Sequence, residues 1–199
     1  MEKDRMKKQW EFALEIDKEK YIGRQTWLSD GKRKENDAEH AWHAALMAVV
    51  FSEYANENID VLKTVLMILI HDLVEIDSGD TYAYDEEGKK TQRQREERGA
   101  DRIFGMLPED QGKQFRALWE EFEEWKTPEA RFAHVMDNLQ PMMLNAATDG
   151  KSWTEHGIRL EQILNRNRHT SEGSEVLWEY AKENFIQPHL EQGHIKSPE

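Results

Sequence analysis

The chain contains no cysteine, and this absence excludes disulfide bonds, thiolate nucleophiles and thiolate metal sites. It also lacks any apolar run close to the ~20 residues that a helix needs to cross a bilayer. Its start, MEKDRMKKQWEF, has no apolar segment of the kind found in secretory signals, so we expect a cytoplasmic protein with no membrane partner. Any metal that the chain binds must be held by histidine and carboxylate side chains.

Basic residues are in short supply, because 27 Lys and Arg face 40 Asp and Glu, which gives a net charge of −13. A surface of this sign repels nucleic-acid backbones, and no stripe of basic residues alternates with aromatic ones. Polymeric nucleic acid is therefore not expected as a partner. A small phosphorylated ligand remains compatible with the charge, since a bound divalent cation and one or two arginines can invert the potential inside a pocket.

Helical periodicity runs through most of the sequence, and no clean alternation of apolar and polar residues predicts a strand. We therefore predict an all-α fold, with Met6, Trp10 and Leu14 on the inner side of the first helix and Asp37 capping the second. No repeat or linker divides the chain, so residues 1–199 are expected to form one domain. The predicted helices cover about 4–19, 37–56, 58–77, 91–107, 109–125, a segment from Pro128, 153–168 and 173–192, with loops at 21–36 and 81–90.

The segment VLMILIHDLVEIDSGD places His71 and Asp72 directly after an apolar run. Burying an unpaired carboxylate is costly, so a charge of opposite sign is expected beside Asp72, and a metal ion is the obvious candidate. On a helix, Glu75 would share a face with both residues and could act as an acid or base on a metal-bound water. The alternative is a hydrogen-bonded His71 next to an exposed Asp72, which the apolar surroundings disfavour.

Two further ligands are predicted on other helices. His40 begins the apolar segment AWHAALMAVVF, and His43, one turn later, is its alternative, although a supporting or core role suits His43 better. In HVMDNLQP, Asp137 lies among apolar residues, so a compensating positive charge is again expected beside it. His134, three residues earlier, is expected to be an outward or core side chain.

These residues follow the order H…HD…D that is typical of the HD-domain metal-dependent phosphohydrolases. The flanking segments RKENDAEH and HDLVEIDSGD resemble the signatures of one branch, the 5′-deoxynucleotidase-like HD proteins. The resemblance covers roughly residues 10–185. It implies a compact HD-domain helical bundle of about seven to eight helices, with the N- and C-terminal helices packed on the core.

The resemblance also implies an activity, the hydrolysis of a deoxyribonucleoside 5′-monophosphate to the deoxyribonucleoside and phosphate. One divalent ion, Mn²⁺, Co²⁺, Fe²⁺ or Mg²⁺, would be needed. Glu75 would be the catalytic acid or base, and Asp80 would act on the substrate or orient the site. The implied metal ligands are His40, His71, Asp72 and Asp137.

In this family an arginine and a tryptophan before the first histidine contact the substrate, the arginine on the phosphate and the tryptophan by the sugar. Arg24 and Trp27 in GRQTW are the matching residues, although two residues separate them here and some members have them adjacent. Arg33 is a second possible phosphate contact. Both arginines could instead be surface residues, and Trp27 could be part of the core. The resemblance, together with Trp and Met residues near the C-terminal helices, also predicts a homodimer.

Three alternatives stay open. An HD hydrolase of this kind could act on another phosphate ester, such as a nucleoside triphosphate or a cyclic or modified nucleotide. A regulatory module could bind metal or nucleotide without turnover, although all four ligand positions and Glu75 are intact. A purely structural helical bundle would leave the acids in apolar segments unexplained.

Overall fold

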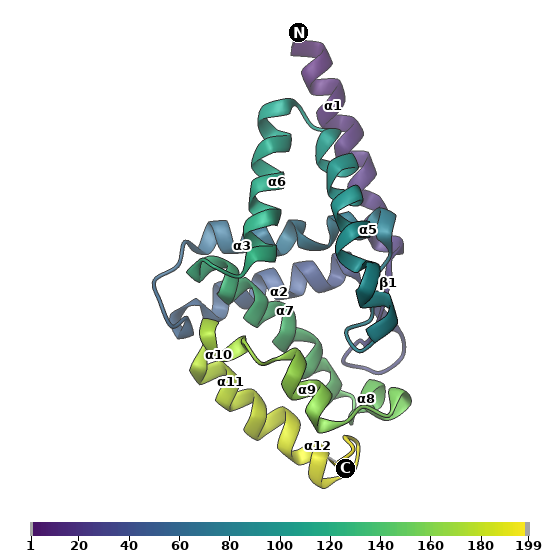
Figure 1. Cartoon of the computed structure of the whole chain (residues 1–199), viewed down its shortest axis with the longest axis vertical. Helices are drawn as coiled ribbons and strands as arrows, with labels where there is room; N and C mark the ends of the chain where they lie inside the picture. The colour runs from purple at the N-terminus through teal and green to yellow at the C-terminus, as the bar shows by residue number, and fades with distance from the viewer. Residues whose placement is uncertain (1, 198–199) are drawn as a thin grey trace.

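The structure is a computed structural model, and it describes residues 2–197 except for the side chain of Glu86. Helices dominate this part of the chain, which confirms the all-α class. Within residues 2–197 no helix is both long and apolar enough to span a membrane. α1 (Glu2–Glu15) lies at one end of the longest axis and α12 (Gln187–Glu191) at the other (Figure 1).

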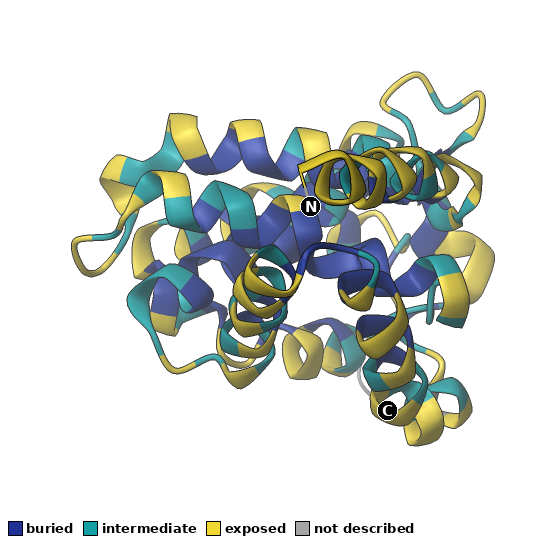
Figure 2. Cartoon of the chain, turned by 90° about the horizontal axis from the view of Figure 1, so that it is seen from above, coloured by how far each residue is buried: buried dark blue, intermediate teal, exposed yellow. Residues whose placement is uncertain are grey.

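The central helix is α7 (Pro128–Ala147), and it packs against α2 (Asp37–Phe51), α3 (Val61–Ile70) and α6 (Glu109–Glu124). Pro128 suits the first turn, where a missing N–H costs nothing, and the side chain of Thr127 accepts a hydrogen bond from the amide of Ala130. Phe132, Val135 and Met136 on α7 are completely buried. The buried segments gather around this region in the middle of the molecule (Figure 2).

α5 (Glu86–Gly105) and α6 form a hairpin that projects at the same end as α1 (Figure 1). α1 is fixed to this hairpin by Phe12, whose ring meets Phe115 edge-on at a centroid distance of 5.8 Å. The prediction that Met6, Trp10 and Leu14 face inward is wrong, since they are 52%, 71% and 75% exposed. The helix extends beyond the core, so only the side that carries Phe12 is covered.

The segment 21–36, predicted as a loop, contains a two-stranded antiparallel hairpin of β1 (Gly23–Trp27) and β2 (Lys34–Asn36). Strands this short carry too few residues for a visible alternation pattern. β2 leads directly into α2, and its last residue, Asn36, caps that helix by accepting a hydrogen bond from the amide of Glu39. The cap is therefore Asn36 and not Asp37. Between α1 and the hairpin lies the 3₁₀-helix η1 (Ile16–Tyr21).

The helix predicted over 58–77 is interrupted. α3 ends at Ile70, the tighter 3₁₀-helix η3 (His71–Val74) follows, and α4 (Glu75–Ser78) completes the segment before Gly79, whose φ of +71° ends it. α5 begins at Glu86, earlier than predicted, because the side chain of Asp85 accepts hydrogen bonds from two amides of its first turn. A short 3₁₀-helix, η2 (Ser52–Tyr54), follows α2.

The C-terminal part, predicted as two helices, consists of five short α-helices in the described residues. Gly157, with φ of +61°, ends the first of them, and the side chain of Ser174 caps the fourth by accepting from the amide of Leu177. The five are α8 (Lys151–His156), α9 (Leu160–Arg166), α10 (Thr170–Gly173), α11 (Glu175–Ala181) and α12, with the π-helix η4 (Lys182–Ile186) before α12.

Candidate metal centre and substrate pocket

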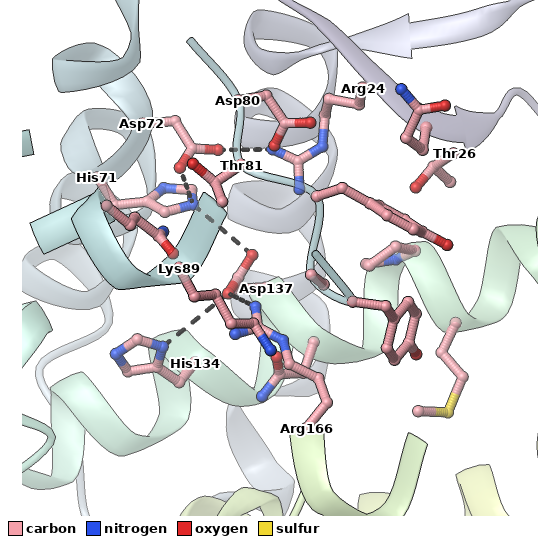
Figure 3. A pocket seen from close by; sticks show the side chains of 18 of the residues that line it. Arg24, Thr26, His71, Asp72, Asp80, Thr81, Lys89, His134, Asp137 and Arg166 are labelled. Atoms are coloured by element: carbon pink, nitrogen blue, oxygen red, sulfur yellow. Dashed lines mark hydrogen bonds and ion pairs between the residues drawn. The ribbon is translucent and has the colours of Figure 1, made fainter. Parts of the chain in front are cut away.

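α2 packs against α7 and η3 packs against α2, and this brings the four predicted ligand residues together. Figure 3 shows three of them, His71, Asp72 and Asp137, facing one another. Nε2 of His40, which is completely buried, lies 3.1 Å from Oδ1 of Asp137. Nε2 of His71 lies 3.1 Å from Oδ1 of Asp72 and 3.7 Å from Oδ1 of Asp137. One possible ligand atom from each of His40, His71 and Asp72 lies within 4.8 Å of the other two, which is close enough for all three to bind one ion.

Backbone and side-chain acceptors fix the orientation of both histidine rings. Nδ1 of His71 donates to the carbonyl of Ile68 at 2.6 Å, and Nδ1 of His40 donates to Oε1 of Gln140 at 2.8 Å. Gln140 is held in turn, since its amide donates to Oε2 of Glu35 at 2.8 Å. In both rings the Nε2 lone pair is left for a ligand, as metal-binding histidines require.

The donor set fits a divalent cation. Nε2 of His71 is buried and has no hydrogen-bond partner within residues 2–197, which is costly for a polar atom unless an ion or ligand completes the site. Two neutral imidazole nitrogens and two carboxylates are ligands that suit Mn²⁺, Fe²⁺, Co²⁺ or Mg²⁺ to different degrees.

The electrostatics of this cluster favour a positive charge. Burial raises the pKa of Asp137, but its contacts with His40 and His71 and the charge of Arg166 outweigh burial and hold the pKa well below its usual range. Burial lowers the pKa of His71, but the charge of Asp72 and the contact with Asp137 raise it well above normal in the metal-free chain. The carboxylates are thus ionised and attract a cation.

A second group of carboxylates lies next to the first. Oxygens of Asp37, Glu75 and Asp80 lie within 4.8 Å of one another, and Nη1 of Arg24 joins the two groups, 3.1 Å from Oδ1 of Asp37 and 2.8 Å from Oδ2 of Asp72. Burial, together with the charge of Asp72, raises the pKa of Asp37 to about 7 and that of Glu75 well above normal. Such crowded acids must share protons or cations, so the geometry does not limit the site to one ion.

Both groups open into a pocket of about 250 Å³. Arg24, Glu75 and Asp80 line it, as do the ligand residues His71, Asp72 and Asp137. The lining also includes aromatic side chains from the segment before α5 and from α8, together with two cations: Tyr82, Tyr84, Trp153, Lys89 and Arg166.

The structure does not bring Trp27 and Arg33 into the pocket lining. Trp27 is the last residue of β1, three residues after Arg24, and the register of the strand is irregular between Gly23 and Trp27. The indole of Trp27 donates to Glu155 at 2.9 Å, and the ammonium group of Lys151 lies 3.3 Å from its ring centre. Arg33 is exposed and donates with both terminal nitrogens to the carboxylate of Glu39, at 2.8 and 2.6 Å.

Sequence reasoning missed several residues that contact this site. Asp37 and Gln140 each lie one helical turn from a ligand, Asp37 before His40 and Gln140 after Asp137, and this spacing could have marked them. Arg166 lies 29 residues after Asp137 and reaches it through space, with Nη2 3.3 Å from Oδ2. No local pattern marks that contact.

A helical bundle that buries two histidines and two aspartates around one point is the arrangement of the HD domain. The chain belongs to this family, because the family model for the HD domain matches residues 16–178.

Among solved structures, a "predicted metal-dependent phosphohydrolase" from Magnetospirillum magnetotacticum MS-1 is 42% identical, with a TM-score of 0.92 over 98% of this chain and 96% of that one. A conserved hypothetical protein from Pyrococcus furiosus shares the fold, with a TM-score of 0.63, 22% identity and coverage of 87% of this chain and 96% of that one. The human protein named 5′-deoxynucleotidase HDDC2 is 31% identical over 129 residues, which are 64% of this chain and 61% of that protein. The match thus spans about three fifths of the human relative's length.

Proposed function

We propose that this protein is a metal-dependent phosphohydrolase that converts deoxyribonucleoside 5′-monophosphates to deoxyribonucleosides and phosphate. The observation that carries the proposal is the buried cluster of His40, His71, Asp72 and Asp137 at the base of a pocket that also contains Glu75. The name of the human relative, 5′-deoxynucleotidase, supports this activity, and the name of the Magnetospirillum relative supports a metal-dependent phosphohydrolase.

The four cluster residues would hold the divalent ion. A bound ion supplies Lewis acidity toward the phosphoryl group and lowers the pKa of water. The chain orients the ligands: the contacts of His71 with Ile68 and of His40 with Gln140 keep both Nε2 atoms directed at the site.

Glu75 is the proposed acid and base. It is 5% exposed, lines the pocket, and has a pKa raised well above normal by burial and by the charges of Asp72, Asp37 and Asp80. A carboxyl group with a raised pKa can take a proton from the attacking water and give one to the leaving 5′ oxygen near neutral pH. Asp80, whose pKa is also raised by burial, lines the same pocket and would orient the substrate.

Arg24 is proposed to support the site and to add positive charge where the phosphate enters. Its guanidinium is shared between Asp37 and Asp72, and Nε lies 3.6 Å from Oε1 of Glu35. These contacts place an always-charged group between the two carboxylate clusters.

We further propose that residues 1–199 act as one unit in the cytoplasm and form a homodimer. α2 and α3 pack on each other and on α7, so the sides that face away from α7 form one surface, which we name the α2–α3 face. Exposed apolar patches of this kind mark interaction sites, and a second copy would cover the face through a two-fold interface. The face carries Trp42, Leu46, Val49, Val50, Leu62 and Leu69, which are 40–69% exposed.

The test of the activity is phosphate release from a panel of deoxyribo- and ribonucleoside mono- and triphosphates. Chelator-stripped protein would be assayed with and without Mn²⁺, Co²⁺ and Mg²⁺. We expect metal-dependent release from deoxyribonucleoside monophosphates. Release only from another ester would change the substrate class, and tight metal binding with no turnover on any ester would favour the regulatory module.

A further inference from the structure

Acidic residues outnumber basic ones in the lining of the pocket that a phosphate monoester would enter. Six carboxylate residues line it, against three residues that carry a permanent positive charge, Arg24, Lys89 and Arg166. Arg24 is largely committed, because its Nη1 already contacts both Asp37 and Asp72. A dianionic substrate therefore needs a further cation that is held in place but still has donors to offer.

Arg166, the last residue of α9, meets this requirement. Its side chain is 39% exposed and lines the pocket, and it contacts Asp137 through a single 3.3 Å bond from Nη2 to Oδ2. Among residues 2–197, Asp137 is the hydrogen-bond and ion-pair partner of the Arg166 side chain. A guanidinium has five N–H donors, so most of them remain available to a ligand.

The position of Arg166 relative to the metal cluster is set by the two oxygens of one carboxylate. Oδ1 of Asp137 lies beside Nε2 of His40 and His71, at 3.1 and 3.7 Å, while Oδ2 faces Arg166. Only the carboxylate of Asp137 thus separates the guanidinium of Arg166 from the metal cluster, where the phosphoryl group would be held. Arg24 approaches the cluster from another side of the pocket (Figure 3).

His134 also lies near Oδ2 of Asp137, but its ring does not donate a hydrogen bond to that oxygen. Nε2 of His134 donates to the carbonyl of Phe122 at 2.8 Å, so Nδ1, which lies 4.0 Å from Oδ2 of Asp137, is an acceptor. The positive charge beside Oδ2 of Asp137 therefore comes from Arg166.

We propose that Arg166 is a substrate-binding residue that donates N–H groups to non-bridging phosphate oxygens, opposite Arg24. The inference rests on the proposed function, since it assumes that the substrate carries a phosphate group at the metal cluster. It predicts that Arg166 contributes to binding of the substrate and of the product phosphate, and little to binding of the metal.

The test compares Arg166→Ala and Arg166→Lys with Arg168→Ala as the matched control. Arg168 lies two residues further on, is exposed, contacts Asn165 and His169, and does not line the pocket. Three quantities would be measured on each protein: KM and kcat for the best nucleotide, the dissociation constant of inorganic phosphate from the Mn²⁺-loaded protein, and the dissociation constant of Mn²⁺ from the stripped protein.

We expect Arg166→Ala to raise KM and the phosphate dissociation constant by about 10- to 100-fold, the usual range for a lost charge-assisted hydrogen bond. The lysine variant should recover part of this loss, and Mn²⁺ binding and the Arg168→Ala protein should stay close to wild type. Unchanged phosphate binding in Arg166→Ala would overturn the inference, as would an equal loss of Mn²⁺ binding, which would make Arg166 a support for Asp137. The phosphate measurement separates this outcome from a failed nucleotidase assignment, because it does not depend on nucleotide turnover.

Discussion

Glu19 offers a direct test of how the fold tolerates buried acids behind the metal site. It lies in η1, is 8% exposed, and its Oε1 has no hydrogen-bond partner among the described residues. Burial, reinforced by the charge of Asp72, raises its pKa from 4.5 to about 8. We predict that Glu19→Gln stabilises the metal-free protein, and that the gain grows with pH.

The sign follows from proton linkage. Because the pKa of Glu19 is higher in the folded chain than in the unfolded one, the unfolded chain releases its proton first as the pH rises from about 4.5 toward 8. With Glu19 protonated in both states, below pH 4.5, the folded chain has its full stability. It loses stability as the pH rises from about 4.5 to about 8. Between pH 5 and 7.5 the loss is about 3 kcal/mol, taking roughly 1.4 kcal/mol for each pKa unit.

The assay is urea unfolding in EDTA, followed by tryptophan fluorescence at several pH values for wild type and Glu19→Gln. The difference in unfolding free energy should rise by about 3 kcal/mol from pH 5 to 7.5, since the other titrating groups are common to both proteins. Glu53→Gln, at an exposed glutamate in the 3₁₀-helix η2, is the control and should show a flat difference. A flat difference for Glu19→Gln as well would refute the reasoning.

Three further predictions concern the site and the surface. Asp72→Ala should abolish both metal binding and turnover, while Glu75→Ala should keep the metal and lose turnover; a near-normal rate in Glu75→Ala would remove Glu75 from its proposed role. Gln140→Leu should weaken Mn²⁺ binding by about 10- to 100-fold in calorimetry, because Nδ1 of His40 loses its acceptor; unchanged affinity would show that packing alone orients the ring. Leu46→Arg on the α2–α3 face should convert a dimer to a monomer in light scattering and leave metal affinity unchanged, and a wild-type monomer would contradict the proposed dimer.

The parts of the site that could be predicted from the sequence are those that stand out locally. His40, the pair His71 and Asp72, and Asp137 are polar residues inside apolar helical segments, where burial without compensation is costly. They converge because α2 packs on α7 and η3 packs on α2. Periodicity predicts that these segments are helical, but not which helices pack together. The break at His71 was not visible, because η3 covers four residues, too few to alter the periodicity of the apolar residues.

The parts that could not be predicted depend on contacts between distant segments. The hairpin of β1 and β2 decides that Arg24 faces the pocket and Trp27 does not, and its strands are too short to read from alternation. Arg166 reaches Asp137 only because α9 lies beside α7 in space.

The buried acids connect stability to the proposed function. Glu19, Asp37 and Glu75 all have pKa values raised by burial and by the charge of Asp72, so each makes the metal-free fold less stable as the pH rises. A cation bound beside Asp72 would offset that charge and relieve all three at once, because binding to the folded chain alone stabilises it. In a purely structural bundle these acids would lower the stability of the fold, and no bound cation would offset that loss. The purely structural bundle is therefore the weakest of the alternatives.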